Sequence, residues 1–432
     1  MESALQSAVA EFIERHPGSQ RLHQQALESL PGGNTRTLLH TAPFPVFMRK
    51  GEGCNLWDED GNKYYDLVGE LSAGLYGHSH PTLQRVLTET IHNIGFTLGA
   101  TNVYEQRYAS LLCERFGLER LRFTNSGTEA NLHCLAAARK FTGKRKVIVF
   151  RGAYHGSVLS FGEGIAENNV DQGDWLLVQY NDANGVREAF AQHRDIAAVI
   201  LEGIQGSAGY IAGSRDFLKT IREQSEKAGA LMILDEVMTS RLAPGGLKGT
   251  LDIEPDLITL GKYLGGGLPF GAFGGRRDIM DVFNPLTPGT LTHSGTFQNN
   301  TLMLHAGYAG LSEVYTPEVV RKFNLQGDEL RQRLQKIFAN SKLCVTGVGS
   351  LMCIHATETG ILPENIACRD TVAAIEATDL KELFWLELVN AGFWVQIRGS
   401  ITLNIVTPAH VLDAFVVAVE DFCKKHVSLI TV

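Results

Sequence analysis

Short apolar segments alternate with segments of helical spacing between about residues 100 and 280. Segments that are apolar on both faces, with helices between them, predict a mostly parallel sheet covered by helices on both sides. In such α/β sheets, ligands bind beyond the carboxyl ends of the strands. We therefore expect an α/β fold with functional residues at those ends. The apolar segments are residues 122–124, 147–150, 197–201, 231–234 and 257–260.

Both ends of the chain have a mixed pattern instead. Residues 7–29 have helix-like spacing of Val9, Phe12 and Ile13, and residues 58–62 predict a hairpin turn. Near the C-terminus, helices are predicted at 325–338 and 409–425, and strands at 350–355 and 400–404. We expect an N-terminal segment (1–75) and a C-terminal α+β segment (316–432) to form one small domain. The large domain is then 76–315.

Composition excludes several classes of protein. A chain of 432 residues suits two or three domains, and its net charge of −8 argues against nonspecific nucleic-acid binding. The sequence has no apolar run of membrane-spanning length and no basic leader, which favours a cytoplasmic location and no membrane partner. Its seven cysteines are scattered without a C-x-x-C pair, so neither disulfides nor a metal site is expected.

Two charged residues follow predicted strands. Asp235 ends the segment 231–234, and Lys262 follows the segment 257–260 beside a run of glycines at 265–267. A lysine amine can form a Schiff base with the aldehyde of pyridoxal 5'-phosphate, and a carboxylate can keep the ring nitrogen protonated. Each residue alone is more often a solvated lysine or a strand-end cap. Together they predict a catalytic pair for this cofactor.

A third part of the same site follows the segment 122–124. Ser126, Gly127 and Thr128 lie between that strand and a predicted helix, where free backbone N–H groups suit a phosphate. An ordinary N-cap is the alternative for this segment in isolation. Tyr154 follows the segment 147–150, where an aromatic ring can stack on the pyridine ring or simply pack in a loop. Its neighbour His155 can orient that loop.

These motifs resemble one family. Residues 125–130 (Asn-Ser-Gly-Thr-Glu-Ala), 154–156 (Tyr-His-Gly), 234–237 (Leu-Asp-Glu-Val), 261–267 and 293–297 (His-Ser-Gly-Thr-Phe) look like the class III, fold-type I pyridoxal-phosphate aminotransferases. The likeness extends over about residues 31–398.

The resemblance implies a role for each matching residue. Lys262 is implied to be the Schiff-base lysine, Asp235 the partner of the ring nitrogen, and the loop 126–128 the phosphate ligand. Thr296 is implied to reach the phosphate of a neighbouring subunit. The resemblance therefore also implies a homodimer with its active site at the subunit interface. Glu202 and Met238 are implied to lie near the ring, with a structural Glu and a core Met as the alternatives.

Two subgroups of the family resemble the chain most, the β-phenylalanine (β-amino acid) aminotransferases and the glutamate-1-semialdehyde aminomutases. Arg36 and Arg398 are candidates for binding substrate carboxylates, because a guanidinium matches a carboxylate with two hydrogen bonds. Their flanking sequences resemble the first subgroup. The region 393–408 lacks the Phe-Glu-Ala type motif of the aminomutases, and the loop 294–300 lacks their Gly-Asn-Pro ending.

The expected activity is therefore amino transfer from an aromatic β-amino acid or a related amine to a keto acid such as 2-oxoglutarate or pyruvate. The alternatives are an aminomutase-like isomerase and, more remotely, a non-catalytic cofactor-binding protein. A set of apolar residues can line an aromatic side-chain pocket or form ordinary core. These residues are Phe44, Phe47, Leu75, Tyr76 and Trp394.

Overall fold

The computed structural model describes residues 1–432, and its internal contacts divide the chain into two compact units. Unit 1 comprises Met1–His80, Gln326–Asn365 and Val372–Val432, and unit 2 comprises Pro81–Leu325 and Ile366–Thr371. Two helices, α11 (Pro317–Ile337) and α12 (Arg369–Ala373), contribute residues to both units. None of the helices combines the length and apolar character needed to cross a bilayer.

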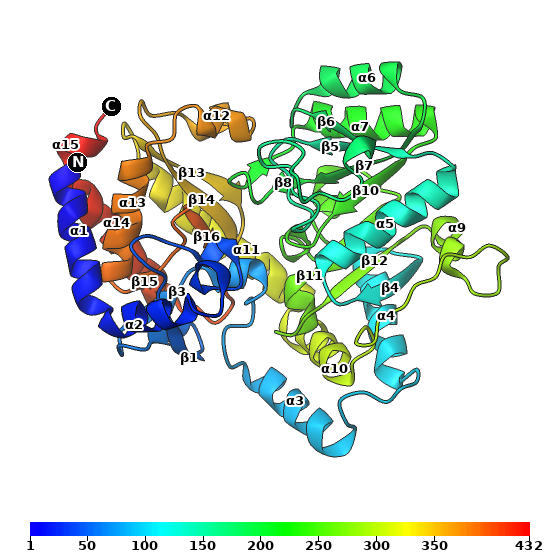
Figure 1. The fold of residues 1–432 in the computed structure, drawn as a ribbon, viewed down its shortest axis with the longest axis horizontal. Coiled ribbons are helices and arrows are strands. Elements are labelled where there is room, and N and C mark those ends of the chain that lie inside the picture. The colour runs from blue at the N-terminus through cyan, green and yellow to red at the C-terminus, as the bar shows by residue number, and fades with distance from the viewer. The chain divides into compact units, whose positions relative to one another are not determined.

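Unit 2 is built on a seven-stranded sheet (Figure 1). Every neighbouring pair is parallel except the two pairs made by β12, which runs against both β11 and β4. This confirms the predicted α/β fold with a mostly parallel sheet. In spatial order the strands are β4 (Arg120–Thr124), β12 (Gly271–Gly275), β11 (Leu257–Gly261), β10 (Leu231–Asp235), β7 (Ile196–Glu202), β5 (Lys146–Phe150) and β6 (Trp175–Val178).

Helices cover both faces of this sheet. Val147 and Val149 of β5 belong to a core cluster that includes Ala130 and Leu135 of α5. Phe150 contacts Phe217 of α7 instead, with ring centroids 4.9 Å apart. Because successive strand residues point to opposite faces, α5 and α7 cover opposite sides. The helices of unit 2 are α3 (Pro81–Asn93), α4 (Val103–Phe116), α5 (Gly127–Thr142), α6 (Ala183–Gln192), α7 (Arg215–Ala228), α8 (Lys248–Leu251), α9 (Arg277–Met280) and α10 (Thr301–Ala309). Strands β8 (Ile204–Gln205) and β9 (Ile211–Ala212) pair with each other as a two-stranded antiparallel ribbon.

Unit 1 contains two small sheets. One has the order β1 (Met48–Glu52), β2 (Asn55–Asp58), β3 (Lys63–Asp66) and β15 (Phe393–Trp394), so both chain ends contribute to it. The predicted turn at residues 58–62 joins the antiparallel strands β2 and β3. The other sheet has the order β13 (Leu343–Val348), β14 (Leu351–Ala356) and β16 (Ser400–Thr402).

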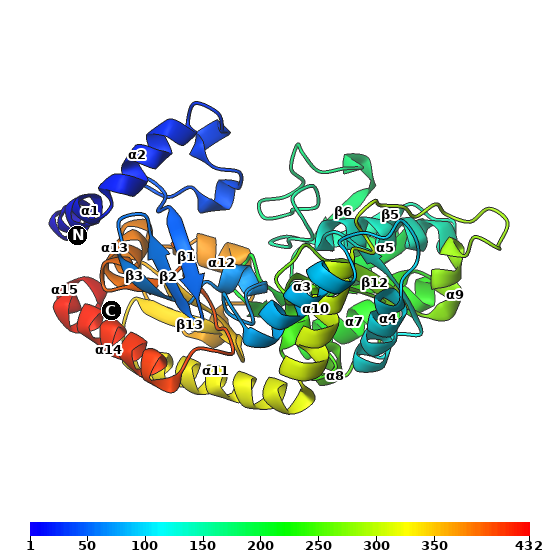
Figure 2. The ribbon, with the colours of Figure 1, turned by 90° about the horizontal axis from the view of Figure 1, so that it is seen from below.

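Four helices and a terminal turn surround these sheets (Figure 2). They are α1 (Glu2–Arg15), α2 (Pro17–Ala26), α13 (Thr378–Asn390), α14 (Ala409–Lys425) and α15 (Val427–Ile430). The bounds of α14 agree with the prediction, and its face of Leu412, Phe415, Val416 and Val419 is buried. The helix-like spacing at residues 7–29 corresponds to helical structure, but not to one continuous helix. It forms two helices, because Pro17 cannot continue α1 and instead occupies the first position of α2.

Candidate active site

Three polar residues lie in one row at the carboxyl ends of neighbouring strands of unit 2. Asp235 of β10 is the register partner of Glu202 on β7 and of Thr259 on β11. All three are buried within segments that are otherwise apolar. A buried polar residue needs hydrogen-bond partners, and an ionised one needs them most. This edge of the sheet therefore holds buried polar residues at the strand ends where functional residues were expected.

The Asp235 carboxylate is held by three donors. Its Oδ1 accepts from the Val237 N–H at 2.9 Å. Its Oδ2 accepts from Asn131 Nδ2 at 2.8 Å and contacts His155 Nδ1 at 2.8 Å. A carboxylate has about four acceptor positions, so three donors leave capacity for one more. The carboxylate is thus fixed in place and can still accept the N–H of a ring.

Asn131 links this carboxylate to the neighbouring strand. It lies on α5, its Nδ2 also donates to the carbonyl of His155 at 2.9 Å, and its Oδ1 accepts from Thr259 Oγ1 at 2.8 Å. Neither Asn131 nor Thr259 was predicted from the sequence. Both carry a recognisable signal, since each is a polar residue on the apolar face of a helix or inside an apolar strand.

Glu202 anchors the loop that follows β5. Its Oε1 accepts from the Tyr154 N–H at 3.0 Å, and its Oε2 accepts from the Gly206 N–H at 2.9 Å. Burial raises the pKa of Glu202 to about 7; the nearby Asp235 raises it further, while His155 and the two N–H donors oppose the shift. Met238 packs against Gly206, where an added Cβ would meet its Cε at 2.0 Å. Glu202 and Met238 are therefore close to each other.

The N-terminus of α5 forms the expected loop. Ser126 is the N-cap, and its side chain accepts from the Glu129 N–H at 3.2 Å. The N–H groups of Gly127 and Thr128, in the first turn, have no acceptor within the helix, which suits an anion. A Cβ on Gly156 would lie 2.2 Å from Thr128 Oγ1, so the Tyr154–Gly156 segment packs directly on this loop.

Tyr154 and Lys262 adjoin the same groups. Tyr154 is 49% exposed although its neighbours Ala153 and His155 are buried. Lys262 follows β11 directly, is half-buried, and has a φ of 57°, which is unusual for a residue with a side chain. The side chain of Val237 packs against both Gly127 of the α5 loop and Gly261, which precedes Lys262. A Cβ added to Gly127 would lie 2.8 Å from this side chain, and one added to Gly261 would lie 3.0 Å from it.

These groups fit pyridoxal phosphate. The helix N-terminus suits the phosphate, the fixed carboxylate suits a protonated ring nitrogen, and an exposed aromatic and a half-buried lysine adjoin them. His155 Nε2 is buried without a hydrogen-bond partner, so the protein leaves a polar atom unsatisfied beside Asp235.

The remaining predicted residues belong to other segments of the chain. Thr296 is exposed in the loop before α10 of unit 2. Arg36 and Arg398 are both exposed and both belong to unit 1. Arg36 Nη1 donates to Glu70 Oε1 at 2.5 Å. Glu70 was not predicted from the sequence as the partner of Arg36.

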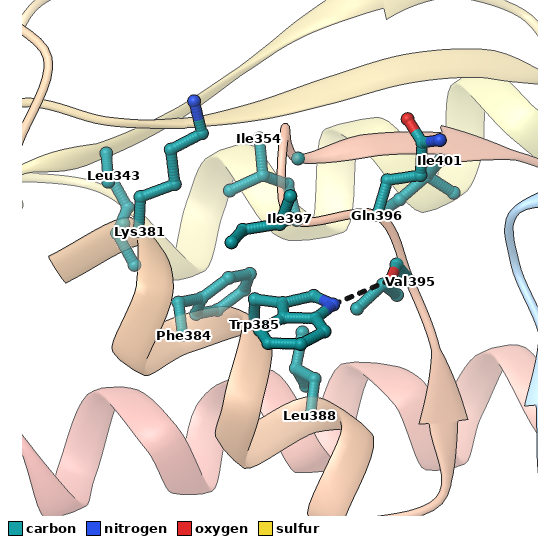
Figure 3. A pocket seen from close by; sticks show the side chains of 12 residues that line it. Leu343, Ile354, Lys381, Phe384, Trp385, Leu388, Val395, Gln396, Ile397 and Ile401 are labelled. Atoms are coloured by element: carbon teal, nitrogen blue, oxygen red, sulfur yellow. Dashed lines mark hydrogen bonds between the residues drawn. The ribbon is translucent and has the colours of Figure 1, made fainter. Parts of the chain in front are cut away.

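Gln396, Ile397 and Gly399, which flank Arg398 in the sequence, line a small apolar pocket of unit 1 (Figure 3). Trp385 Nε1 donates to the carbonyl of Val395 at 3.0 Å, and the Ile354 N–H of β14 donates to the carbonyl of Gly399 at 2.9 Å. The side chains of Phe384 and Leu388 also line this pocket. The backbone that carries Arg398 is thus fixed at both ends.

The aromatic and apolar residues proposed for a side-chain pocket are mostly core. Phe44, Leu75 and Tyr76 are buried, and the ring of Phe44 lies 5.4 Å from that of Phe12. Phe47 and Trp394 are partly exposed. Core packing is therefore the better account of the first three residues.

Comparisons with known proteins agree with this geometry. Residues 39–421 match the family model "Aminotransferase class-III". An uncharacterized aminotransferase of Schizosaccharomyces pombe is 49% identical over 99% of this chain and 97% of its own length. The beta-phenylalanine transaminase of Variovorax paradoxus is 43% identical over 100% of this chain and 98% of its own. A crystal structure of the beta-phenylalanine aminotransferase from Variovorax paradoxus superposes with a TM-score of 0.96, covering 100% of this chain and 99% of that one.

Aminomutases are also related. A glutamate-1-semialdehyde 2,1-aminomutase of Caldicellulosiruptor bescii is 32% identical over 92% of this chain and 96% of its own length. The family match covers most of the chain, and two relatives exceed 40% identity over nearly their full lengths. The chain therefore belongs to the class III aminotransferases, enzymes of the fold-type I architecture that depend on pyridoxal phosphate.

Proposed function

We propose that the enzyme transfers an amino group from an aromatic, β-phenylalanine-like β-amino acid, or a related amine, to a keto acid such as 2-oxoglutarate or pyruvate in a ping-pong reaction. The similarity to a beta-phenylalanine transaminase over the whole chain carries this proposal. The two exposed arginines of unit 1 add support, since a β-amino acid and a keto acid both present carboxylates.

The residues of the site have distinct roles in this proposal. When bound, pyridoxal phosphate supplies an aldehyde and an electron-withdrawing ring. Lys262 Nζ would hold the aldehyde carbon of the bound cofactor, and as a free neutral amine it would accept the proton from the amine-bearing carbon of the substrate. Asp235 holds the proton of the ring nitrogen, and Oδ1 has the greater spare capacity because it accepts only one N–H.

The other residues bind and orient. The first-turn N–H groups of Gly127 and Thr128, with Ser126, bind the phosphate. Tyr154 stacks on the ring, while Glu202 and Met238 lie beside it and Glu202 fixes the Tyr154 backbone. Arg36 and Arg398 bind substrate carboxylates with paired hydrogen bonds. Thr296 reaches the phosphate of the partner subunit.

A homodimer is supported by an apolar surface on unit 2. The exposed residues Phe96 and Leu98 precede α4, and the exposed Phe297 precedes α10. The two segments are adjacent, because the Thr301 N–H donates to the Phe96 carbonyl and Asn299 Nδ2 donates to the Ala100 carbonyl. Clustered exposed apolar residues mark interaction surfaces. We also propose a cytoplasmic location, which the seven unpaired cysteines support.

An assay with two substrates tests the proposal against its main alternative. The purified enzyme is given β-phenylalanine with 2-oxoglutarate, and separately glutamate-1-semialdehyde without a keto acid. We expect glutamate to form in the first reaction and little isomerisation in the second. Isomerisation without keto-acid consumption would instead establish the aminomutase, and no reaction with a panel of α-, β- and ω-amino acids would favour a non-catalytic protein.

A further inference from the structure

Residues Gly69–Ser72 of unit 1 form an unusual turn, η3. Four successive residues have positive φ angles: 49° for Gly69, 46° for Glu70, 54° for Leu71 and 79° for Ser72. Left-handed backbone is rare for residues with a Cβ and is almost never adopted by three of them in a row. Such a conformation persists only where the surrounding structure determines it, and it often marks a functional position.

Neighbouring residues hold this turn firmly. Asp66 Oδ1 accepts from the N–H groups of Val68 and Gly69 at 2.9 and 3.0 Å, and its Oδ2 contacts His78 Nε2 at 2.9 Å. The Gly74 N–H donates to the Gly69 carbonyl at 2.8 Å. A Cβ on Gly69 would lie 2.7 Å from the carbonyl oxygen of Thr402, so only glycine fits against β16.

The turn presents Glu70 to Arg36. The Nη1–Oε1 distance is 2.5 Å, and the two side chains are 46% and 56% exposed. An exposed ion pair contributes little net stability, so a carboxylate from solution can replace one partner. The glutamate is therefore carried by a rigid backbone, while its contact with the arginine is exchangeable.

We propose that Glu70 is a specificity-determining residue: an internal carboxylate that occupies Arg36 until the substrate carboxylate displaces it. This inference rests on the proposed role of Arg36 in binding substrate carboxylates. Every carboxylate that binds Arg36 must then compete with Glu70, which lowers its apparent affinity. An amine without a carboxylate makes no use of Arg36 and meets no such competition.

The test uses the holoenzyme and the nearly isosteric variant Glu70→Gln, which keeps the size of the side chain on the turn. We expect KM for β-phenylalanine to fall about three-fold, the effect of removing a surface ion pair. KM for 1-phenylethylamine and kcat should not change. The dissociation constant of 3-phenylpropanoate, a carboxylate without an amine, should fall by the same factor in calorimetry. Glu52→Gln is the matched control, because Glu52 forms an equally short and exposed ion pair with Lys50 in the same unit.

A second background separates displacement from a general effect of charge. In an Arg36→Gln enzyme, Glu70→Gln should change neither KM nor the binding of 3-phenylpropanoate. The inference is overturned if Glu70→Gln leaves KM unchanged or raises it, or if the improvement persists without Arg36. If Arg36→Gln alone does not weaken β-phenylalanine binding, the proposed role of Arg36 fails and the inference fails with it. If Arg36→Gln weakens binding but Glu70→Gln has no effect, only the inference fails.

Discussion

The raised pKa of Glu202 gives a pH-dependent prediction. The side chain is buried beside Asp235, and burial is the largest cause of its pKa of about 7, against an ordinary value of 4.5. A carboxyl whose pKa is raised on folding favours the folded protein when protonated. Its contribution is fully present below pH 4.5 and is lost as the pH rises through about 7.

The magnitude follows from the interval between those two values. The difference between the pKa of Glu202 in the unfolded chain and in the folded protein should lower the unfolding free energy of the wild type by about 3 kcal/mol between pH 4.5 and pH 8. The variant Glu202→Gln cannot ionise, so it should lack this loss. It should also lose one of the two acceptor bonds to the N–H groups of Tyr154 and Gly206, a cost of about 1–3 kcal/mol at every pH.

Urea unfolding of the cofactor-free wild type and variant at pH 5 and pH 8 measures both effects. The variant should be the less stable protein at pH 5, and the difference should shift in its favour by about 2.5 kcal/mol at pH 8, because a small part of the loss has already occurred at pH 5. A constant difference across this range would refute the account of Glu202 as a buried carboxyl that titrates near neutrality.

Two further variants test the construction of the site. Gly156→Ala should destabilise the fold by about 2–4 kcal/mol and weaken cofactor binding, because the new Cβ would meet Thr128 Oγ1 at a position with a φ of 125°. Urea unfolding and cofactor titration measure the two effects. The control is Gly162→Ala, which should be neutral because nothing lies within 4 Å of the added Cβ. Asn131→Ala removes three buried hydrogen bonds, one to a carboxylate, and should lower the unfolding free energy by about 3–5 kcal/mol. Thr259→Val removes only one of these hydrogen bonds and should lower it less. An equal loss of unfolding free energy in both variants would contradict the role given to the other two bonds of Asn131.

Much of the large sheet was predictable from local sequence. Five of its strands contain short, largely apolar segments, and such segments predict buried parallel strands without any knowledge of their partners. Strand β12 was missed because its sequence, Gly-Ala-Phe-Gly-Gly, has low strand propensity. Its glycines are required by close neighbours instead, since a Cβ on Gly271 would lie 2.1 Å from the Ser126 carbonyl oxygen.

The site was predictable where chemistry limits the choice of residue. Lys262 and Asp235 stand out because a lysine and a carboxylate at strand ends have few structural uses together. Asn131 and Thr259 were not identified, because their roles depend on contacts between residues 104 and 128 positions apart in the chain. The pairing of Glu70 with Arg36 depends on a left-handed turn, which no local pattern predicts for residues other than glycine.

The proposed roles of all the other site residues depend on a covalent bond between Lys262 and the cofactor. Borohydride reduction of the purified holoenzyme, followed by proteolysis and peptide mass mapping, tests this directly. We predict one pyridoxyl adduct, on the peptide that contains Lys262, and neither an adduct nor transamination in Lys262→Ala. An adduct on any other lysine, or full activity in that variant, would contradict the account.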